Sequence, residues 1–372
     1  MFTISLKQYS ETKYYFLLFD VLLKKVNITK EVFLKEAGIS PSSYRKARTI
    51  EQNVGEKIIS QLCTSLNYKN VDRKFIDDFE EFINNIYFNV YYKVYKTYDE
   101  DLKKLDELLK ENYILFPIIK LIKLFMVANS HIESDEFITK YKEEFLELKK
   151  YTDFFNEDLL EIYDILSLLF EPVLPENLMF KTFKNSLVYY SIASRLCRDK
   201  RFVECLFISK KAEEILVKER NYKRLLYLNI KVMYSLSAIH SYQECYELAN
   251  MQLYTLQSFV NTEFEFNNTI KHLVIASIAL KKYSTIENVL MNKKNIFIME
   301  LCCLLIAKYH TDNDEYNNMF NYYHKALKKE EDICAITCID SYLKNKDKKD
   351  LSKLENINIL DTLIYAIKIS EI

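Results

Sequence analysis

Three serines and three basic residues lie close together in the segment SPSSYRKAR. Guanidinium and ammonium groups pair with phosphate oxygens, and hydroxyl and ammonium groups also reach hydrogen-bonding atoms on base edges. We expect Arg45 and Arg48 to contact phosphates, and Ser42, Ser43 and Lys46 to face base edges. The segment therefore predicts a contact with double-stranded DNA. A basic helix face that contacts only solvent is the alternative interpretation.

The charge of the chain is distributed unevenly around this segment. Residues 1–74 contain 13 lysines and arginines against 7 acidic residues, whereas the whole chain has 52 basic and 53 acidic residues. An electropositive N-terminal part on an acidic remainder favours an anionic polymer as the partner of that part. Chance variation in charge is the alternative.

Residues typical of helix starts and helix ends surround the basic segment. Apolar residues recur at helical spacing over residues 12–26, and Thr29 is expected to cap a second helix that begins with KEVF. Gly38 is expected to end that helix in the left-handed conformation, and Ser40 with Pro41 to begin a third. Two short helices joined by a three-residue turn that contains glycine form a helix-turn-helix unit.

These residues resemble the DNA-binding helix-turn-helix of the phage-repressor class. The core positions of that motif are matched here by Phe33, Ala37, Ile39, Tyr44 and Ala47. Leu34 departs from the pattern, because the class usually has a small residue at that position. Gly55, the second of the two glycines, falls near the start of a fourth helix, after the tight loop that follows a recognition helix. The resemblance implies that the third helix lies in the major groove of DNA.

The remainder of the chain is expected to be helical as well. Two glycines and four prolines are too few for the turns of a β-sandwich or β-barrel, and a hydrophobic content of 49% excludes a disordered chain. A connecting helix is expected over residues 75–96. We therefore predict an all-α chain with a helix-turn-helix domain over residues 1–70, a connecting segment over 71–98 and a helical domain over 99–372.

A degenerate repeat runs through the helical domain. An aromatic-x-Glu-Cys pattern occurs twice, 40 residues apart, and ends at Cys205 and at Cys245. Tyr283 and Tyr316 begin two weaker copies. Each copy follows one helix and opens another, so the repeating unit is a helical hairpin.

The hairpin pattern resembles the tetratricopeptide repeat over residues 184–329, and residues 99–171 share only its rhythm of helices. Small residues fall at repeat positions in the first and last copies, namely Ala193, Ala212, Ala307 and Ala326, whereas Met233 and Val274 depart from the small position. The resemblance implies a right-handed α-α superhelix whose first helices line a concave groove suited to a peptide. The residues that the repeat phase turns toward this groove are Tyr190, Ser194, Arg198, Tyr227, Asn229, Tyr234, Asn268, Lys271 and Lys308.

The chain lacks the patterns of a catalytic or metal site. Two glycines leave no Gly-rich phosphate loop, and the five histidines have no metal-ligand spacing. Cys334 and Cys338 with His324 come nearest to a ligand set, and we expect no metal there. Eight cysteines without a C-x-x-C pair suit a reducing cytosol, and the apolar stretch ILFPIIKLIKLFMVA is too short to span a bilayer. We expect a cytoplasmic protein that is not an enzyme and has no cofactor.

A repressor-like head followed by degenerate tetratricopeptide repeats resembles the cytoplasmic peptide-pheromone receptors of Gram-positive bacteria and their phages. That family comprises the Rap, Rgg, NprR, PlcR and PrgX proteins and the arbitrium receptors. The resemblance implies a homodimeric transcription regulator that binds an inverted-repeat operator and is controlled by a short signalling peptide, as in quorum sensing or phage lysis–lysogeny control. Two other functions stay open: a Rap-like regulator or phosphatase of a response regulator, and a helical-repeat scaffold that binds no DNA.

Overall fold

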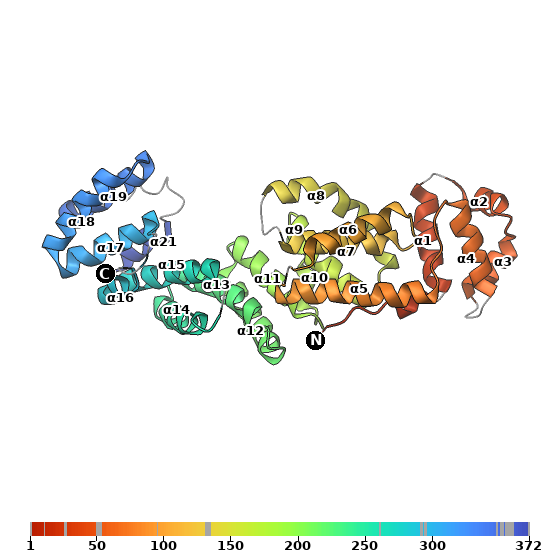
Figure 1. Ribbon diagram of the computed structural model, residues 1–372, viewed down its shortest axis with the longest axis horizontal. Coiled ribbons are helices and arrows are strands. Elements are labelled where there is room, and N and C mark those ends of the chain that lie inside the picture. Colours follow the sequence, from red (N-terminus) through yellow and green to blue (C-terminus); the bar gives the residue numbers. More distant parts are fainter. Residues whose placement is uncertain are drawn as a thin grey trace. The chain divides into compact units, whose positions relative to one another are not determined.

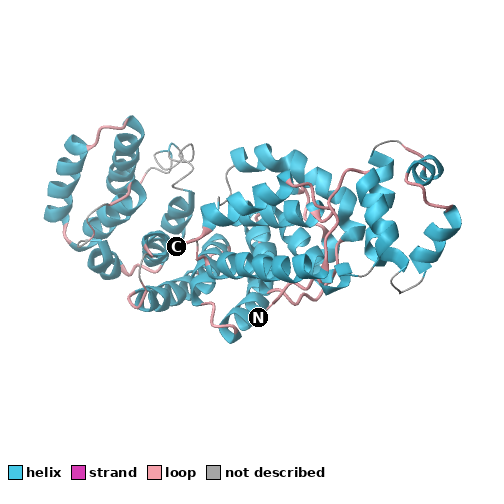
Figure 2. Ribbon diagram, turned by 45° about the vertical axis from the view of Figure 1, so that its right-hand side comes forward, coloured by secondary structure: helices cyan, strands magenta, loops and turns pink. Residues whose placement is uncertain are grey.

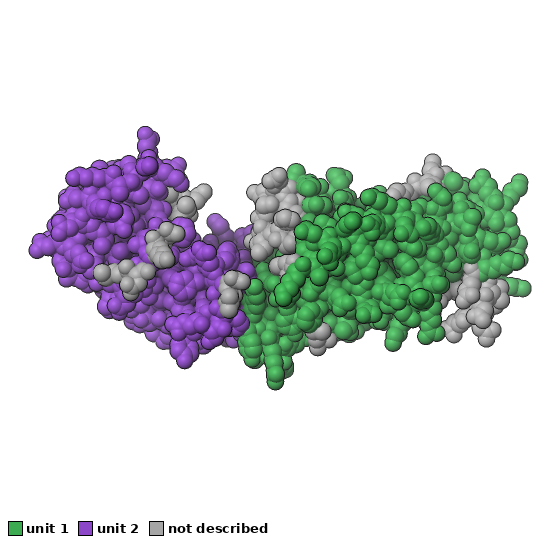
Figure 3. Space-filling model, in the orientation of Figure 1, with its two compact units in different colours: residues 1–195, 214–224 green, residues 196–213, 225–372 purple. Residues whose placement is uncertain are grey.

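The computed structural model describes residues 2–10, 12–25, 28–49, 54–94, 96–130, 135–259, 262–290, 293, 296–346, 349, 353 and 361–370. Within these residues the chain consists of helices and contains no β-strand, which confirms the predicted all-α class for them (Figures 1 and 2). They form two compact units, residues 1–195 with 214–224 and residues 196–213 with 225–372 (Figure 3). No helix of this part is both long enough and apolar enough to cross a membrane.

Unit 1 begins with a group of short helices, which we call the head. The head consists of α1 (Thr12–Lys25), α2 (Lys30–Glu36), α3 (Pro41–Thr49) and α4 (Val54–Ser65), preceded by the 3-10 helix η1 (Lys7–Ser10). α1 packs against each of the other elements of the head. The apolar pattern that predicts a helix over 12–26 is its buried stripe, which includes Leu18, Phe19 and Leu22.

The start and the end of α2 and the start of α3 lie where the sequence predicts them. The hydroxyl of Thr29 accepts a hydrogen bond from the backbone N–H of Val32 at 3.5 Å, which caps α2. Gly38 follows α2 with a φ of +67°, the left-handed conformation expected for it. Ser40 Oγ accepts from the backbone N–H of Ser43 at 3.1 Å and so caps α3.

The rest of unit 1 is built around one apolar helix. Its elements are α5 (Arg73–Tyr92), α6 (Tyr98–Lys110), α7 (Phe116–Ser130), α8 (Asp135–Leu148), η2 (Lys149–Phe154), α9 (Glu157–Phe170), α10 (Glu176–Phe180) and most of α11 (Ser186–Arg198). α7 packs against α5, α6, α8 and α9. The apolar stretch near residue 120 is therefore the core helix of this unit, and the predicted connecting helix is α5.

Unit 2 is a succession of packed helix pairs. Its elements are α12 (Phe202–Lys218), α13 (Tyr222–Ala238), α14 (Tyr242–Leu256), α15 (Glu263–Ala279), α16 (Tyr283–Leu290), α17 (Ile298–Thr311), α18 (Asn313–Ala326), α19 (Glu330–Asn345) and α21 (Asp361–Ser370), although the end of α12 and the start of α13 belong to unit 1. Packing of α14 on α15, α16 on α17 and α17 on α18 is consistent with a helical repeat.

The repeat motif coincides with the helix starts. The aromatic residue of the motif is the first residue of α12, α14 and α16, but Tyr316 is the fourth residue of α18. The position three residues after the aromatic is fully buried in the first three copies, at Cys205, Cys245 and Ile286. In the last copy this position is Met319, which is half-buried, and Ala326 ends α18 on the surface.

Non-glycine residues form the tight turns between these helices. Lys200, Arg220, His240 and Lys281 have φ values between 56° and 64°. In each turn the next residue's backbone N–H donates to a carbonyl five residues earlier, as Lys282 does to Ser277 at 2.8 Å. This is the left-handed helix end that glycine usually provides. The sequence reasoning, which tied this conformation to glycine, did not predict these four turns.

Candidate nucleic-acid interface and repeat groove

One buried aromatic residue anchors α3. The ring of Tyr44 is 2% exposed and meets Phe16 of α1 edge-on, with the ring centroids 4.9 Å apart. The ammonium group of Lys30 lies 4.2 Å from the centre of the Tyr44 ring and 3.2 Å from Asp20 Oδ1, and the Tyr44 hydroxyl donates to the same oxygen at 3.4 Å. These contacts fix the rotation of α3 about its own axis.

The other face of α3 carries the predicted DNA-binding residues. The exposed ones are Ser42, Ser43, Arg45 and Lys46. Ser40 Oγ lies 3.0 Å from the Ser42 hydroxyl and 2.8 Å from the Ser43 hydroxyl, so three hydroxyl groups gather at the start of α3. The unpaired backbone N–H groups at the start of a helix attract anions, and the positive charges of Arg45 and Lys46 do so as well. The side chains of Ala47 and Arg48 lie outside the described part of the chain.

The residues predicted to line a peptide groove are divided between the two units. Tyr190 and Ser194 belong to unit 1, and the other seven belong to unit 2. In unit 1 the guanidinium group of Arg224 lies 5.0 Å from the centre of the Tyr190 ring. The Ser194 hydroxyl is buried and has no hydrogen-bond partner within the described residues.

In unit 2 the predicted residues of α13 and α15 come together around aromatic contacts. Tyr227 stacks on Phe264 with centroids 5.6 Å apart, and the Asn268 side-chain amide donates to the Phe264 carbonyl at 2.9 Å. Tyr234 meets His272 edge-on at 6.2 Å. The two helices therefore place aromatic and amide groups in adjacent positions.

Lys271 is the cation at this position. Its side chain is half-buried, and burial lowers its pKa. No carboxylate within the described residues pairs with it. The neighbouring His272 is fully buried, and burial together with the charge of Lys271 lowers the pKa of His272 to about 3. His272 is therefore neutral near pH 7, and the positive charge of this pair of residues lies on Lys271.

The remaining predicted groove residues have other surroundings. Lys308 is 4% exposed, and its ammonium group lies 2.6 Å from Glu315 and 3.0 Å from Glu287. Its charge is therefore neutralised within the chain. Arg198 is exposed at the end of α11, and Asn229 is half-buried on α13.

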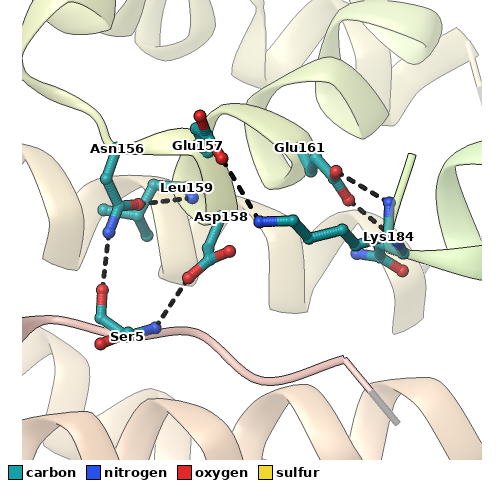
Figure 4. Close-up of polar contacts among 8 residues, drawn as sticks. Ser5, Asn156, Glu157, Asp158, Leu159, Glu161 and Lys184 are labelled. Atoms are coloured by element: carbon teal, nitrogen blue, oxygen red, sulfur yellow. Dashed lines mark hydrogen bonds and ion pairs between the residues drawn. The ribbon is translucent and has the colours of Figure 1, made fainter. Parts of the chain in front are cut away.

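The sequence reasoning missed a contact made by the residues that precede the head. Phe2, Ile4 and Leu6 are buried, whereas Thr3 is exposed and Ser5 is half-buried. Side chains of α5 and of the residues at the start of α9 form hydrogen bonds with the backbone of Ile4 and Ser5. Figure 4 shows the hydrogen bonds at Ser5. Alternation of apolar and polar residues is typical of an extended segment with one buried side, and that signal was present in FTISL.

The described residues contain no group of three His, Cys, Asp or Glu side chains that could hold a metal. Cys334 and Cys338 are neighbours on α19, with their sulfur atoms 3.9 Å apart. Burial raises the pKa of Cys245 to about 11 and that of Cys302 to about 12, which keeps both as unreactive thiols at neutral pH.

Comparison of the chain with protein-family models, with curated proteins and with solved structures finds no match.

Proposed function

We propose that this chain is a DNA-binding transcription regulator that is controlled by a short peptide. In this proposal α2 and α3 form the helix-turn-helix, and α3 enters the major groove. The division of α3 into two faces carries the proposal. Tyr44 packs into the head, while the side chains suited to phosphates and base edges are exposed together on the opposite side.

The electrostatics of the head support a DNA contact. Residues 1–74 have six more basic than acidic residues, and the exposed α3 residues include Arg45 and Lys46. Contacts with phosphates release counterions from DNA, so even a few cations give affinity that falls steeply with salt. One small head covers only a few base pairs, so we propose a homodimer on an inverted repeat with half-sites about 34 Å apart or a multiple of this.

The surroundings of Lys271 support a peptide site in unit 2. An extended peptide needs hydrogen-bond partners for its backbone, an apolar surface and a partner for its terminal carboxylate. Asn268, Tyr227 and Lys271 offer these groups on adjacent helices. A coupling of about 1–3 kcal/mol between the two sites would suffice for regulation.

Charge reversal on α3 tests the DNA contact. We would measure the affinity of the full chain for a fluorescent mixed-sequence duplex by anisotropy at low and moderate salt. The Arg45→Glu, Lys46→Glu double variant should bind at least about tenfold more weakly. Lys103→Glu, on the exposed side of α6 in the same unit, is the matched control and should bind like the wild type. Equal affinity of all three proteins would leave a protein-binding scaffold as the better function.

A further inference from the structure

Residues 2–6 are bound by the rest of unit 1 in the way that a peptide is bound by a receptor. Asn84 of α5 binds both backbone groups of Ile4, since its Oδ1 accepts from the Ile4 N–H and its Nδ2 donates to the Ile4 carbonyl, each at 2.8 Å. Such a pair of bonds recognises an extended backbone whatever its side chain. Neither bond exists in a helix–helix contact, where backbone groups are already paired.

The neighbouring backbone groups are bound by three further side chains. Asn156 Nδ2 donates to the Ser5 carbonyl at 2.6 Å, and the Ser5 N–H donates to Asp158 at 3.1 Å (Figure 4). The Leu6 N–H donates to Glu80 at 2.5 Å. Every backbone N–H from Ile4 to Leu6 is therefore bound by a side chain of α5 or α9. We call Glu80, Asn84, Asn156 and Asp158 the backbone clamp.

Apolar contacts select the side chains at alternate positions. Ile4 and Leu6 are fully buried, and the ring of Phe2 packs against Tyr87 of α5 with centroids 5.2 Å apart. Thr3 is exposed, so the site is selective at every second residue. Main-chain bonds with pockets for alternate side chains are the usual means of recognising an extended peptide.

The clamp itself is held rigid by its own helices. Asn156 Oδ1 accepts from the Leu159 N–H at 2.9 Å and so caps α9, which leaves its Nδ2 directed at Ser5. Asn84 also donates to the Glu80 carbonyl at 2.8 Å within α5. Both α5 and α9 pack on α7. A rigid arrangement of donors and acceptors lowers the entropy lost when a peptide binds.

We propose that the backbone clamp is a binding site for an extended peptide with apolar residues at alternate positions, and that residues 2–6 are its resident, intramolecular ligand. This site lies in unit 1 and is separate from the α13 and α15 site of the proposed function. A free peptide with the same pattern replaces the resident segment when that segment is weakened. Because η1 and α1 follow directly, such an exchange also frees the chain that enters the head.

The test uses the full chain and a labelled, acetylated and amidated peptide of sequence FTISLK. In the wild type the resident segment competes at an effective concentration in the millimolar range, so micromolar peptide should bind weakly. Ile4→Asp removes the buried side chain of the resident segment and leaves the clamp intact. Its affinity for the peptide should be at least about tenfold higher than that of the wild type. Adding Asn84→Asp, which keeps the acceptor and loses the donor, should remove this gain.

Two controls separate backbone recognition from unspecific adhesion. A peptide methylated on the nitrogens of its isoleucine and leucine should not bind, because it lacks the donors that Asn84 and Glu80 require. Asn250→Asp in the Ile4→Asp background should bind like the parent, since the Asn250 amide donates only within α14. Equal binding of the methylated peptide would overturn the proposal.

Hydrogen exchange makes the test independent of how well the variants fold. Saturating peptide should speed the exchange of the backbone amides of Ile4, Ser5 and Leu6 in the wild type. No saturable binding to Ile4→Asp, together with unchanged exchange in the wild type, would overturn the proposal. None of these measurements depends on DNA.

Discussion

The ring of Tyr44 on α3 meets the ring of Phe16 on α1 edge-on, at an angle of 85° between their planes. Lys30 covers the Tyr44 ring at 4.2 Å and is paired with Asp20 of α1. One aromatic contact and one ion pair therefore join the first three helices of the head. Among the α3 side chains that the structure describes, only that of Tyr44 is buried. The exposure of Arg45 and Lys46 to solvent therefore depends on how Tyr44 packs.

Removing the Tyr44 ring should destabilise the head and with it the proposed DNA contact. Truncating a buried aromatic residue costs about 3–5 kcal/mol, so Tyr44→Ala should lower the free energy of unfolding by an amount of this order. Tyr44→Phe keeps the ring and loses the hydroxyl that donates to Asp20 at 3.4 Å, so it should cost less than about 1.5 kcal/mol. Urea unfolding of the full chain measures both. Equal stability of the two variants would show that the ring does not anchor α3.

Arg45 and Lys46 should affect DNA binding in different ways. Loss of a phosphate contact in Arg45→Ala should weaken binding to all duplexes and lower the slope of log affinity against log salt by about one. Loss of a base contact in Lys46→Ala should instead change the preferred sequence, by about 1–3 kcal/mol at one base pair. Selection from a pool of random duplexes, followed by salt titration, distinguishes the two. An unchanged sequence preference in Lys46→Ala would place this lysine on the phosphates.

Local signals in the sequence were sufficient for the head. Thr29, Gly38, Ser40 and Pro41 act within a few residues of themselves, so their effect on α2 and α3 can be predicted without knowing the fold. The repeat motif gave the helix start in three of its four copies, at α12, α14 and α16, whereas Tyr316 is the fourth residue of α18.

Contacts between distant residues could not be predicted in the same way. The clamp on residues 2–6 joins Ile4 to Asn84 and Ser5 to Asn156, which are separated by 80 and 151 residues. The pairing of Lys308 with Glu287 depends on how two successive helices pack, and periodicity alone does not give that geometry. Such contacts decide which candidate residues are free to bind a partner.

Glycine at the left-handed turns of unit 2 should stabilise the chain. A non-glycine residue in this conformation destabilises the folded chain by about 1–2 kcal/mol. Glycine removes this strain, but it loses more conformational entropy on folding, which offsets part of the gain. Lys200→Gly and Lys281→Gly should therefore each raise the free energy of unfolding by about 0.5–1 kcal/mol. Lys210→Gly, on the exposed side of α12, is the matched control and should lower it by about 1 kcal/mol. Urea unfolding would contradict the assigned turns if all three variants lost stability.

His272 should make the stability of the chain depend on pH. Its pKa in the folded chain, about 3, lies below its ordinary value of 6.5, so the unfolded chain takes up a proton that the folded chain excludes. The contribution is complete above pH 6.5 and is lost as the pH falls toward 3, by up to about 1.4 kcal/mol for each pH unit.

The difference between the wild type and a His272 variant isolates this effect from that of the carboxylates. His272→Leu should flatten the dependence of the unfolding free energy on pH between 6.5 and 4. Parallel curves for His272→Leu and the wild type would show that the residue is hydrated in the folded chain.

Lys271 should lose its proton at a lower pH than the exposed lysines, because half-burial without a carboxylate partner destabilises the charged form. Reductive methylation with labelled formaldehyde followed by NMR titration measures this, and Lys271→Arg assigns the signal by its disappearance.

A carboxylate bound beside the ammonium group of Lys271 would restore the charged form and return the pKa of Lys271 toward its ordinary value. A pool of random hexapeptides with free C-termini should therefore shift this signal, whereas the same pool with amidated C-termini should not. The shift should be absent from the signal of the exposed Lys103, which serves as the internal control. Equal shifts with both pools would mean that no terminal carboxylate binds at Lys271.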